Sequence, residues 1–183
     1  DELKKHRLGQ LSKNEIGLLA TQHIGVMFQK YQALGKPMPI ATAIGVAPEV
    51  LAASVVQTPY GQDEFAVAGS FRGDPLPLVK CKTLDLEVPA TAEIVLEGHV
   101  NPNPAEWKDE GPFGEFPGYY GGVKMPRPTI LLSAVTNRHN PIFQGTLEGA
   151  PPNESSTIRT IGHTLGAWRK LNLMGVPGVK EVH

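Results

Sequence analysis

The sequence predicts a single α+β domain. Its 183 residues are enough for one hydrophobic core. Hydrophobic residues make up 40% of the chain and charged residues 19%, which is the composition of a folded globular protein. The 20 glycines and 17 prolines favour many turns and irregular loops between short elements, as in sheet-rich or mixed folds.

Four segments are predicted to be helical. The first begins at a capping box, Ser12-Lys13-Asn14-Glu15, and runs to about Leu34, where Gly35 provides the stop. Apolar residues and one histidine recur along it at helical spacing, namely Ile16, Leu19, His23, Met27 and Tyr31. The other three helices are expected at residues 48–54, 63–71 and 151–171.

Short β-branched runs predict strands between these helices. They lie at residues 39–46, 76–84, 92–100 and 129–136, with shorter β segments at 140–144 and 179–182. Residues 101–126 are expected to form a long loop. No internal repeat or linker divides the chain, so residues 1–183 are expected to form one domain.

The overall charge and cysteine content exclude some classes of function. A net charge of −1 gives no support for nucleic acid as the main partner. The single cysteine, Cys81, cannot form an internal disulfide, which favours a reducing compartment such as the cytoplasm. No apolar run approaches the roughly 20 residues of a membrane span, and no signal peptide is visible.

The most informative segment is residues 109–122, DEGPFGEFPGYYGG. Its glycines and prolines predict a shaped loop that holds Glu110 and Glu115 in a fixed relation. Two carboxylates in an aromatic setting can have different pKa values and divide acid and base work. The alternative is an ordinary turn with two surface glutamates. As a nucleotide-binding loop the motif is weak, because neither G-x-G-x-x-G before a helix nor G-K-[ST] is present.

Three other candidate residues each have a functional and a purely structural interpretation. His23 is either a ligand or a satisfied core histidine. Glu64 is either a functional carboxylate or a solvated one at a helix start, and Ser54 is either a site residue or a helix cap. The absence of H-E-x-x-H, of a cysteine pair and of G-x-S-x-G gives zinc hydrolysis and serine-type acyl transfer no local support.

Together these segments resemble the UbiD family of prenylated-flavin-dependent decarboxylases. The resemblance rests on Gln22-His23-Ile24, on the segment from Ser54 to Gly69, and on two long motifs in the expected order. These motifs are V-P-A-T-A-E-I-V-L-E-G at residues 88–98 and E-G-P-F-G-E at residues 110–115.

The resemblance implies a split β-barrel-like flavin-binding domain with flanking helices, which binds prenylated FMN with Mn²⁺ and K⁺. It places two metal ligands on His23 and Glu64, an oxygen and imidazole set that suits manganese. It places Gln22 beside the flavin. The segment that would lie along the flavin and offer backbone carbonyls to K⁺ comprises Ser54, Val55, Val56 and Gln57.

The same resemblance implies a carboxy-lyase that acts on an α,β-unsaturated or aromatic carboxylic acid. Its catalytic unit would be a Glu–Arg–Glu network in which Glu115 donates the proton and Glu110 holds the arginine. The cofactor would supply the difficult chemistry, and the protein would supply position, a dry pocket and an acid.

One part of the family pattern is not found in the sequence. The Asn-x-x-x-x-Arg segment, which holds the third metal ligand and the arginine, does not precede His23 at the needed spacing, although Arg7 lies upstream. The chain is therefore expected to be the central part of a longer protein or a separate subunit, with a homo-oligomer or other chains completing it. The alternatives are a non-catalytic flavin- and metal-binding subunit, and a flavin reductase-like barrel with plain FMN.

Overall fold

The computed structural model describes residues 8–12, 15–18, 22–115, 117–147 and 149–180. Helices and strands are both present, which confirms the predicted mixed fold. The strands are β1 Leu8–Ser12, β2 Glu15–Leu18, β3 Met38–Ile44, β4 Leu78–Lys80, β5 Glu87–Pro89, β6 Ile94–Val100, β7 Lys108–Glu110, β8 Met125–Arg127 and β9 Thr129–Asn137. The helices are α1 Gln22–Ala33, α2 Pro48–Ala53, α3 Glu64–Arg72, the 3-10 turn η1 Pro104–Glu106 and α4 Glu154–Leu173.

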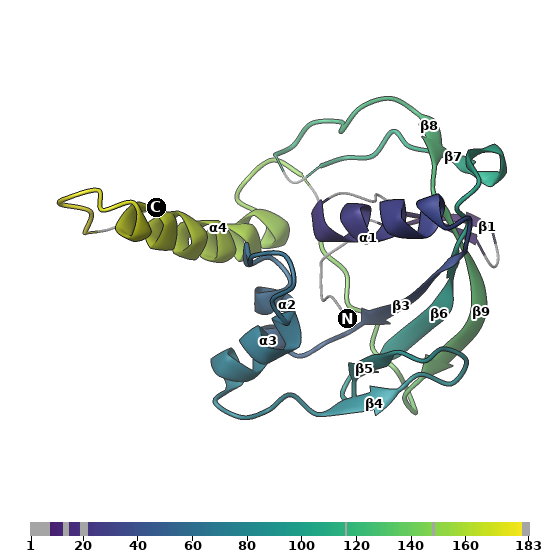
Figure 1. The fold of residues 1–183 in the computed structure, drawn as a ribbon, viewed down its shortest axis with the longest axis horizontal. Coiled ribbons are helices and arrows are strands. Elements are labelled where there is room, and N and C mark those ends of the chain that lie inside the picture. The colour runs from purple at the N-terminus through teal and green to yellow at the C-terminus, as the bar shows by residue number, and fades with distance from the viewer. Residues whose placement is uncertain (1–7, 13–14, 19–21, 116, 148, 181–183) are drawn as a thin grey trace.

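The main sheet has five strands in the order β1-β2-β9-β6-β3, and every pairing is antiparallel. It curves around α1, which lies across its inner face, while α2 and α3 lie to one side and α4 extends away (Figure 1). In the part of the chain that the structure describes, the sheet does not close into a barrel. The other strands among the described residues pair in two small hairpins, β4-β5 and β7-β8.

The main core lies between α1 and the sheet. Ile24 and Phe28 of α1 pack with Met38, Ile40, Val100 and Ile130 from three strands. Burial of each such side chain stabilises the fold by about 1.5–3 kcal/mol. The predicted apolar stripe is therefore only partly right: Met27 and Tyr31 pack at the edge of this core, whereas Ile24 and Phe28 form its centre.

The predicted start of the first helix is wrong. Ser12 ends β1 and Glu15 begins β2, so the apparent capping box belongs to a β-hairpin whose residues 13–14 lie outside the described part. Glu15, Ile16 and Gly17 pair with β9. Sheet pairing therefore overrides the local cap signal, and α1 begins only at Gln22.

The other predicted helices are confirmed, with ends that follow local chemistry. Asp63 caps α3, its carboxyl accepting from the Phe65 N–H at 2.9 Å, and Gly73 ends it in the left-handed conformation at φ 82°. Asn153 caps α4 in a capping box with Ser156.

Several β predictions need correction. The predicted strand 76–84 shortens to β4, because the chain turns back and pairs with β5, which the prediction missed. The predicted loop 101–126 contains the β7-β8 hairpin. Residues 140–144 and 179–180 are irregular, and residues 181–182 lie outside the described part.

A buried carboxylate organises the turn after β4. Glu97 on β6 is 1% exposed and accepts hydrogen bonds from the Lys82 N–H at 2.8 Å, the Thr83 N–H at 2.7 Å and the Thr83 hydroxyl at 2.7 Å. Burial opposes ionisation, but the hydrogen bonds from Thr83 and from these backbone groups outweigh it and hold the pKa of Glu97 below its usual range. Burial raises the pKa of the nearby Cys81 thiol, and the negative charge of Glu97 raises it further.

Glu97→Gln should lower the free energy of unfolding by about 1–3 kcal/mol at pH 7, because charge-assisted hydrogen bonds are lost. Since the folded pKa of Glu97 is lowered, this contribution is present above the unfolded value of about 4.3 and is lost as the pH falls through the folded value. Urea unfolding at pH 7 and in acid should show the difference from wild type shrinking in acid. An equal difference at both pH values, or an equal loss in the exposed control Glu106→Gln, would contradict this account.

Helix α4 packs on the segment after α2 through glycines. A Cβ atom at Gly162 would overlap the Val55 carbonyl, lying 2.8 Å from its carbon, whereas one at Gly166 would meet Gln57 at an ordinary 3.7 Å. Gly162 and Gly166 are buried on the same face of α4. Close helix approach at residue 162 therefore requires glycine.

Gly162→Ala should destabilise the protein by about 1–3 kcal/mol, because the new methyl group meets backbone that cannot rotate away. Gly166→Ala, one helical turn further, should be neutral or stabilising by up to about 1 kcal/mol, because alanine favours helix. Thermal unfolding of the two variants distinguishes them. Equal stability of the two variants would show that the close approach of Gly162 to the Val55 carbonyl does not require glycine.

Candidate functional site

Two helix starts meet at the candidate metal-binding pair. His23 is the second residue of α1 and Glu64 is the first residue of α3. Their side chains approach, with His23 Nδ1 lying 3.6 Å from Glu64 Oε1. The fold thus joins the two residues that the sequence analysis assigned to a metal.

Glu64 is not a solvated carboxylate. Its side chain is fully buried, and the Thr58 hydroxyl donates a hydrogen bond of 2.6 Å to its Oε1. Because Asp63 already caps α3, Glu64 is not needed for that role and its side chain turns inward. A buried carboxylate is costly unless partners or a cation stabilise it, which makes this position unusual for a structural glutamate.

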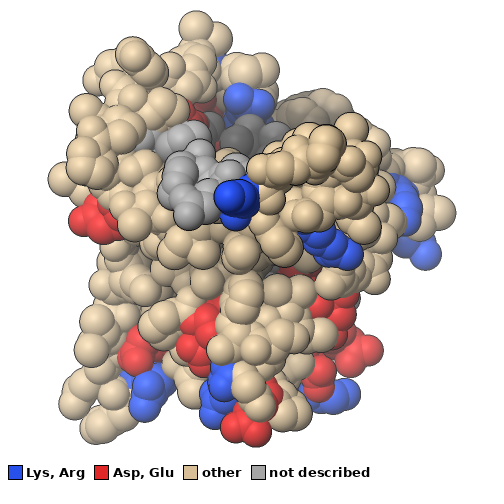
Figure 2. All heavy atoms as spheres, turned by 90° about the vertical axis from the view of Figure 1, so that its left-hand side faces the viewer, with Lys and Arg blue, Asp and Glu red and all other residues tan. Residues whose placement is uncertain are grey.

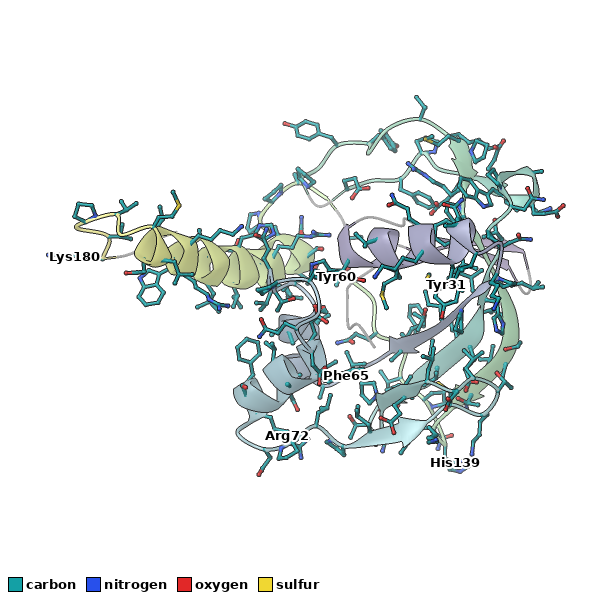
Figure 3. All side chains as sticks on the ribbon, in the orientation of Figure 1. Tyr31, Tyr60, Phe65, Arg72, His139 and Lys180 are labelled. Atoms are coloured by element: carbon teal, nitrogen blue, oxygen red, sulfur yellow. The ribbon has the colours of Figure 1, made fainter. Side chains whose placement is uncertain are left out.

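The loop between α2 and α3 contacts both residues of this pair. It brings Thr58 to Glu64 and places the ring of Tyr60 edge-on to His23, with centroids 5.4 Å apart. The ammonium group of Lys30 donates a hydrogen bond of 2.7 Å to the Tyr60 hydroxyl. Tyr60 lies near the start of α1 (Figure 3). The sequence analysis missed Thr58, Tyr60 and Lys30, and its only signal for the first two was their place in a Pro/Gly loop.

Residues 54–57 lie between α2 and α4. The buried Ser54 hydroxyl donates to the Leu51 carbonyl at 2.7 Å, as in a helix cap. The Gln57 side chain accepts a hydrogen bond of 3.1 Å from Lys170 of α4, and the Val55 carbonyl lies against Gly162. Val56 continues the turn by donating to the Ala53 carbonyl. The segment is therefore held on two sides. Gln22 is the first residue of α1, next to His23.

The hairpin of β7 and β8 and its connection, residues 108–127, form an arm that lies above α1 in Figure 1. Glu110 and Glu115 belong to this arm. Glu110 ends β7 opposite Met125 and is only 3% exposed, so it is not the surface glutamate of the ordinary-turn alternative. Glu115 is partly buried and lies in a tight turn, its N–H donating to the Tyr119 carbonyl at 2.8 Å. The two carboxyls thus have different environments, the condition under which acid and base roles can separate.

A cavity of about 570 Å³ adjoins the site. It lies along β3 and is lined mainly by apolar residues, with Tyr31 of α1 and Phe65 of α3 on different sides (Figure 3). Ser54 and Ile24, the neighbour of His23, belong to its wall. Among the lining residues that the structure describes, the carboxylates of the candidate site do not occur.

The structure thus brings His23 and Glu64 together, and residues 54–57 directly precede Thr58, which donates to Glu64. Among the described residues, no three His, Cys, Asp or Glu side chains cluster closely enough to hold a metal. None of the described helices has the length and apolar character of a membrane span. The face toward the viewer in Figure 2 has basic and acidic residues interspersed in its lower half and no extended patch of one sign.

Comparison with known proteins gives one consistent result. Residues 3–151 match the model of the family described as UbiD, 3-octaprenyl-4-hydroxybenzoate carboxy-lyase Rift-related domain. An uncharacterized protein from Synechocystis sp. is 42% identical over 124 residues, which is 68% of this chain and 24% of that protein.

Solved structures show the same similarity over nearly the whole chain. An evolved dimeric form of the UbiD-class enzyme HmfF from Pelotomaculum thermopropionicum, in complex with prFMN, is 40% identical with a TM-score of 0.88; the match covers 98% of this chain and 41% of HmfF. The closed form of vanillic acid decarboxylase from Sedimentibacter hydroxybenzoicus is 33% identical with a TM-score of 0.90, covering 98% of this chain and 38% of that enzyme.

The chain therefore spans about a quarter of the curated relative and about two fifths of these enzymes. The agreement of motif order, fold and family match leads to one conclusion: this chain belongs to the UbiD family, and it carries that family's Rift-related domain.

Proposed function

We propose that this chain is the cofactor-binding part of a prenylated-FMN-dependent carboxy-lyase. The observation that carries the proposal is the meeting of His23 with the fully buried Glu64, beside the held segment 54–57. The similarity to HmfF, which was solved in complex with prFMN, supports the same cofactor here. Residues 1–183 would form one domain, with the curved sheet around α1 as a split β-barrel-like unit.

The residues present fit a manganese ion. One imidazole and one buried carboxylate, 3.6 Å apart, can ligate a common divalent cation, and this donor set suits Mn²⁺. Since the described residues offer only this pair, the remaining ligands would be cofactor phosphate, water or groups from elsewhere. Gln22 and the backbone of residues 54–57 would contact the flavin, and carbonyls of that segment would hold K⁺.

Glu115, on the arm formed by β7, β8 and their connection, would be the catalytic acid. When bound, prenylated FMN would provide an electron sink for the pair released as the bond to the carboxylate breaks and CO₂ leaves. Glu115, which is partly exposed, would then transfer a proton to the substrate carbon. The buried Glu110 would hold and orient the arginine of the Glu–Arg–Glu network.

The substrate class we propose is an α,β-unsaturated or aromatic carboxylic acid. Similar solved structures include vanillic acid decarboxylase and, at 32% identity, 3,4-dihydroxybenzoic acid decarboxylase from Klebsiella pneumoniae. We propose a cytoplasmic protein that works as an oligomer. A second candidate is a non-catalytic flavin- and metal-binding subunit that needs partner chains to complete the site; the chain spans 41% of HmfF and 38% of vanillic acid decarboxylase.

Glu64→Gln should lower the metal and flavin content of the native protein, produced with a prenyl-FMN synthase, by at least about tenfold, because it removes the negative ligand. Glutamine keeps an acceptor for Thr58, so the fold should remain. Metal analysis and the flavin absorption spectrum measure the effect. The matched control is Glu154→Gln, at the exposed first position of α4. Full metal and flavin content in Glu64→Gln would rule out this ligand.

Glu115→Gln should reduce CO₂ release by about 10²–10⁴-fold, because glutamine cannot donate the proton, while flavin stays bound. CO₂ release from a panel of unsaturated and aromatic acids, with the flavin spectrum recorded in parallel, tests this. Unchanged turnover would refute the role of Glu115. Turnover lost together with the flavin would point to a structural role instead.

A further inference from the structure

The turn that carries Glu115 is closed by backbone hydrogen bonds. The Gly121 N–H donates to the Phe113 carbonyl at 2.9 Å, and the Glu115 N–H donates to the Tyr119 carbonyl at 2.8 Å. Gly114 and Tyr120 form a β-bridge between these two bonds. Glu115 is therefore fixed at its backbone, and its side chain decides where the carboxyl lies.

The side chain of Glu115 lies directly over Gly121. A Cβ atom built on residue 121 would lie 2.5 Å from Glu115 Oε1 and 2.8 Å from its Cδ, with a still closer approach to Cγ. Optimal separations between carbon atoms are about 3.5–4.0 Å, so both groups could not occupy this space. The observed position of the carboxyl exists only because residue 121 has no side chain.

Alanine at residue 121 should move the carboxyl and spare the fold. Gly121 does not have a positive φ, unlike Gly118 at 91° and Gly122 at 99°, so its backbone suits alanine. The three atoms nearest to the added Cβ all belong to one flexible side chain, that of Glu115, which can adopt another rotamer.

We propose that Gly121 is a positioning residue for the acid: its missing side chain creates the space in which the Glu115 carboxyl is held at its working position. The inference rests on the proposed function of Glu115 as proton donor. A misplacement of about 1 Å at a reacting group can reduce a rate about 10²-fold.

The test compares Gly121→Ala with Gly149→Ala. Gly149 also lacks a positive φ, and a Cβ there would meet nothing within 4 Å. In the native protein, carboxyl-¹³C NMR of labelled glutamates at fixed pH follows the Glu115 resonance. This resonance is assigned by its loss in Glu115→Gln. The native protein, loaded with prenylated FMN, gives the rate of CO₂ release and the flavin content.

The proposal expects a changed Glu115 resonance in Gly121→Ala, and a rate about 10²-fold lower with flavin retained. Gly149→Ala should match wild type in all of these. An unchanged Glu115 resonance in Gly121→Ala overturns the inference, and so does a moved resonance with a wild-type rate. A failure of the proposed function is distinguished from a failure of this inference, because it appears as full turnover in Glu115→Gln. In that case the Glu115 resonance in Gly121→Ala still shows whether Gly121 positions the carboxyl.

Discussion

The burial of Glu64 is the constraint on which the site depends. A fully buried carboxylate must be compensated, and here the Thr58 hydroxyl and the His23 imidazole lie against the same oxygen. This requirement ties the start of α1 to the start of α3 and orders the loop between α2 and α3. The same loop brings Tyr60 to His23. A metal ion shared by the two side chains would add the positive charge that such a pair favours.

Two glycines allow close contacts next to candidate site residues. Because residue 162 is glycine, α4 packs closely against the Val55 carbonyl. This contact holds the segment that we propose lies along the flavin. Gly121 leaves room for the side chain of Glu115. In both places the function of glycine is to leave space for a close approach, and neither residue adopts a left-handed conformation.

Local signals predicted the parts of the fold that local chemistry determines. Asp63 before α3 and Gly35 after α1 mark helix ends, and the β-branched run of β9 marks a central strand. The family motifs selected His23 and Glu64, and the fold brings these two together. Whether either binds metal, and whether Glu110 and Glu115 act in chemistry, stays a prediction.

Long-range pairing explains what the sequence could not predict. Ser12 and Glu15 match a helix cap locally, but their strands pair in the sheet and override it. Glu110 lies in a segment rich in glycine and proline, yet pairing with Met125 makes it a buried strand end.

The most direct test of the account is mass spectrometry of the flavin extracted from the native protein, with metal analysis of the same sample. Prenylated FMN and manganese, each near one per chain, are predicted; plain FMN, or neither cofactor, would contradict the account.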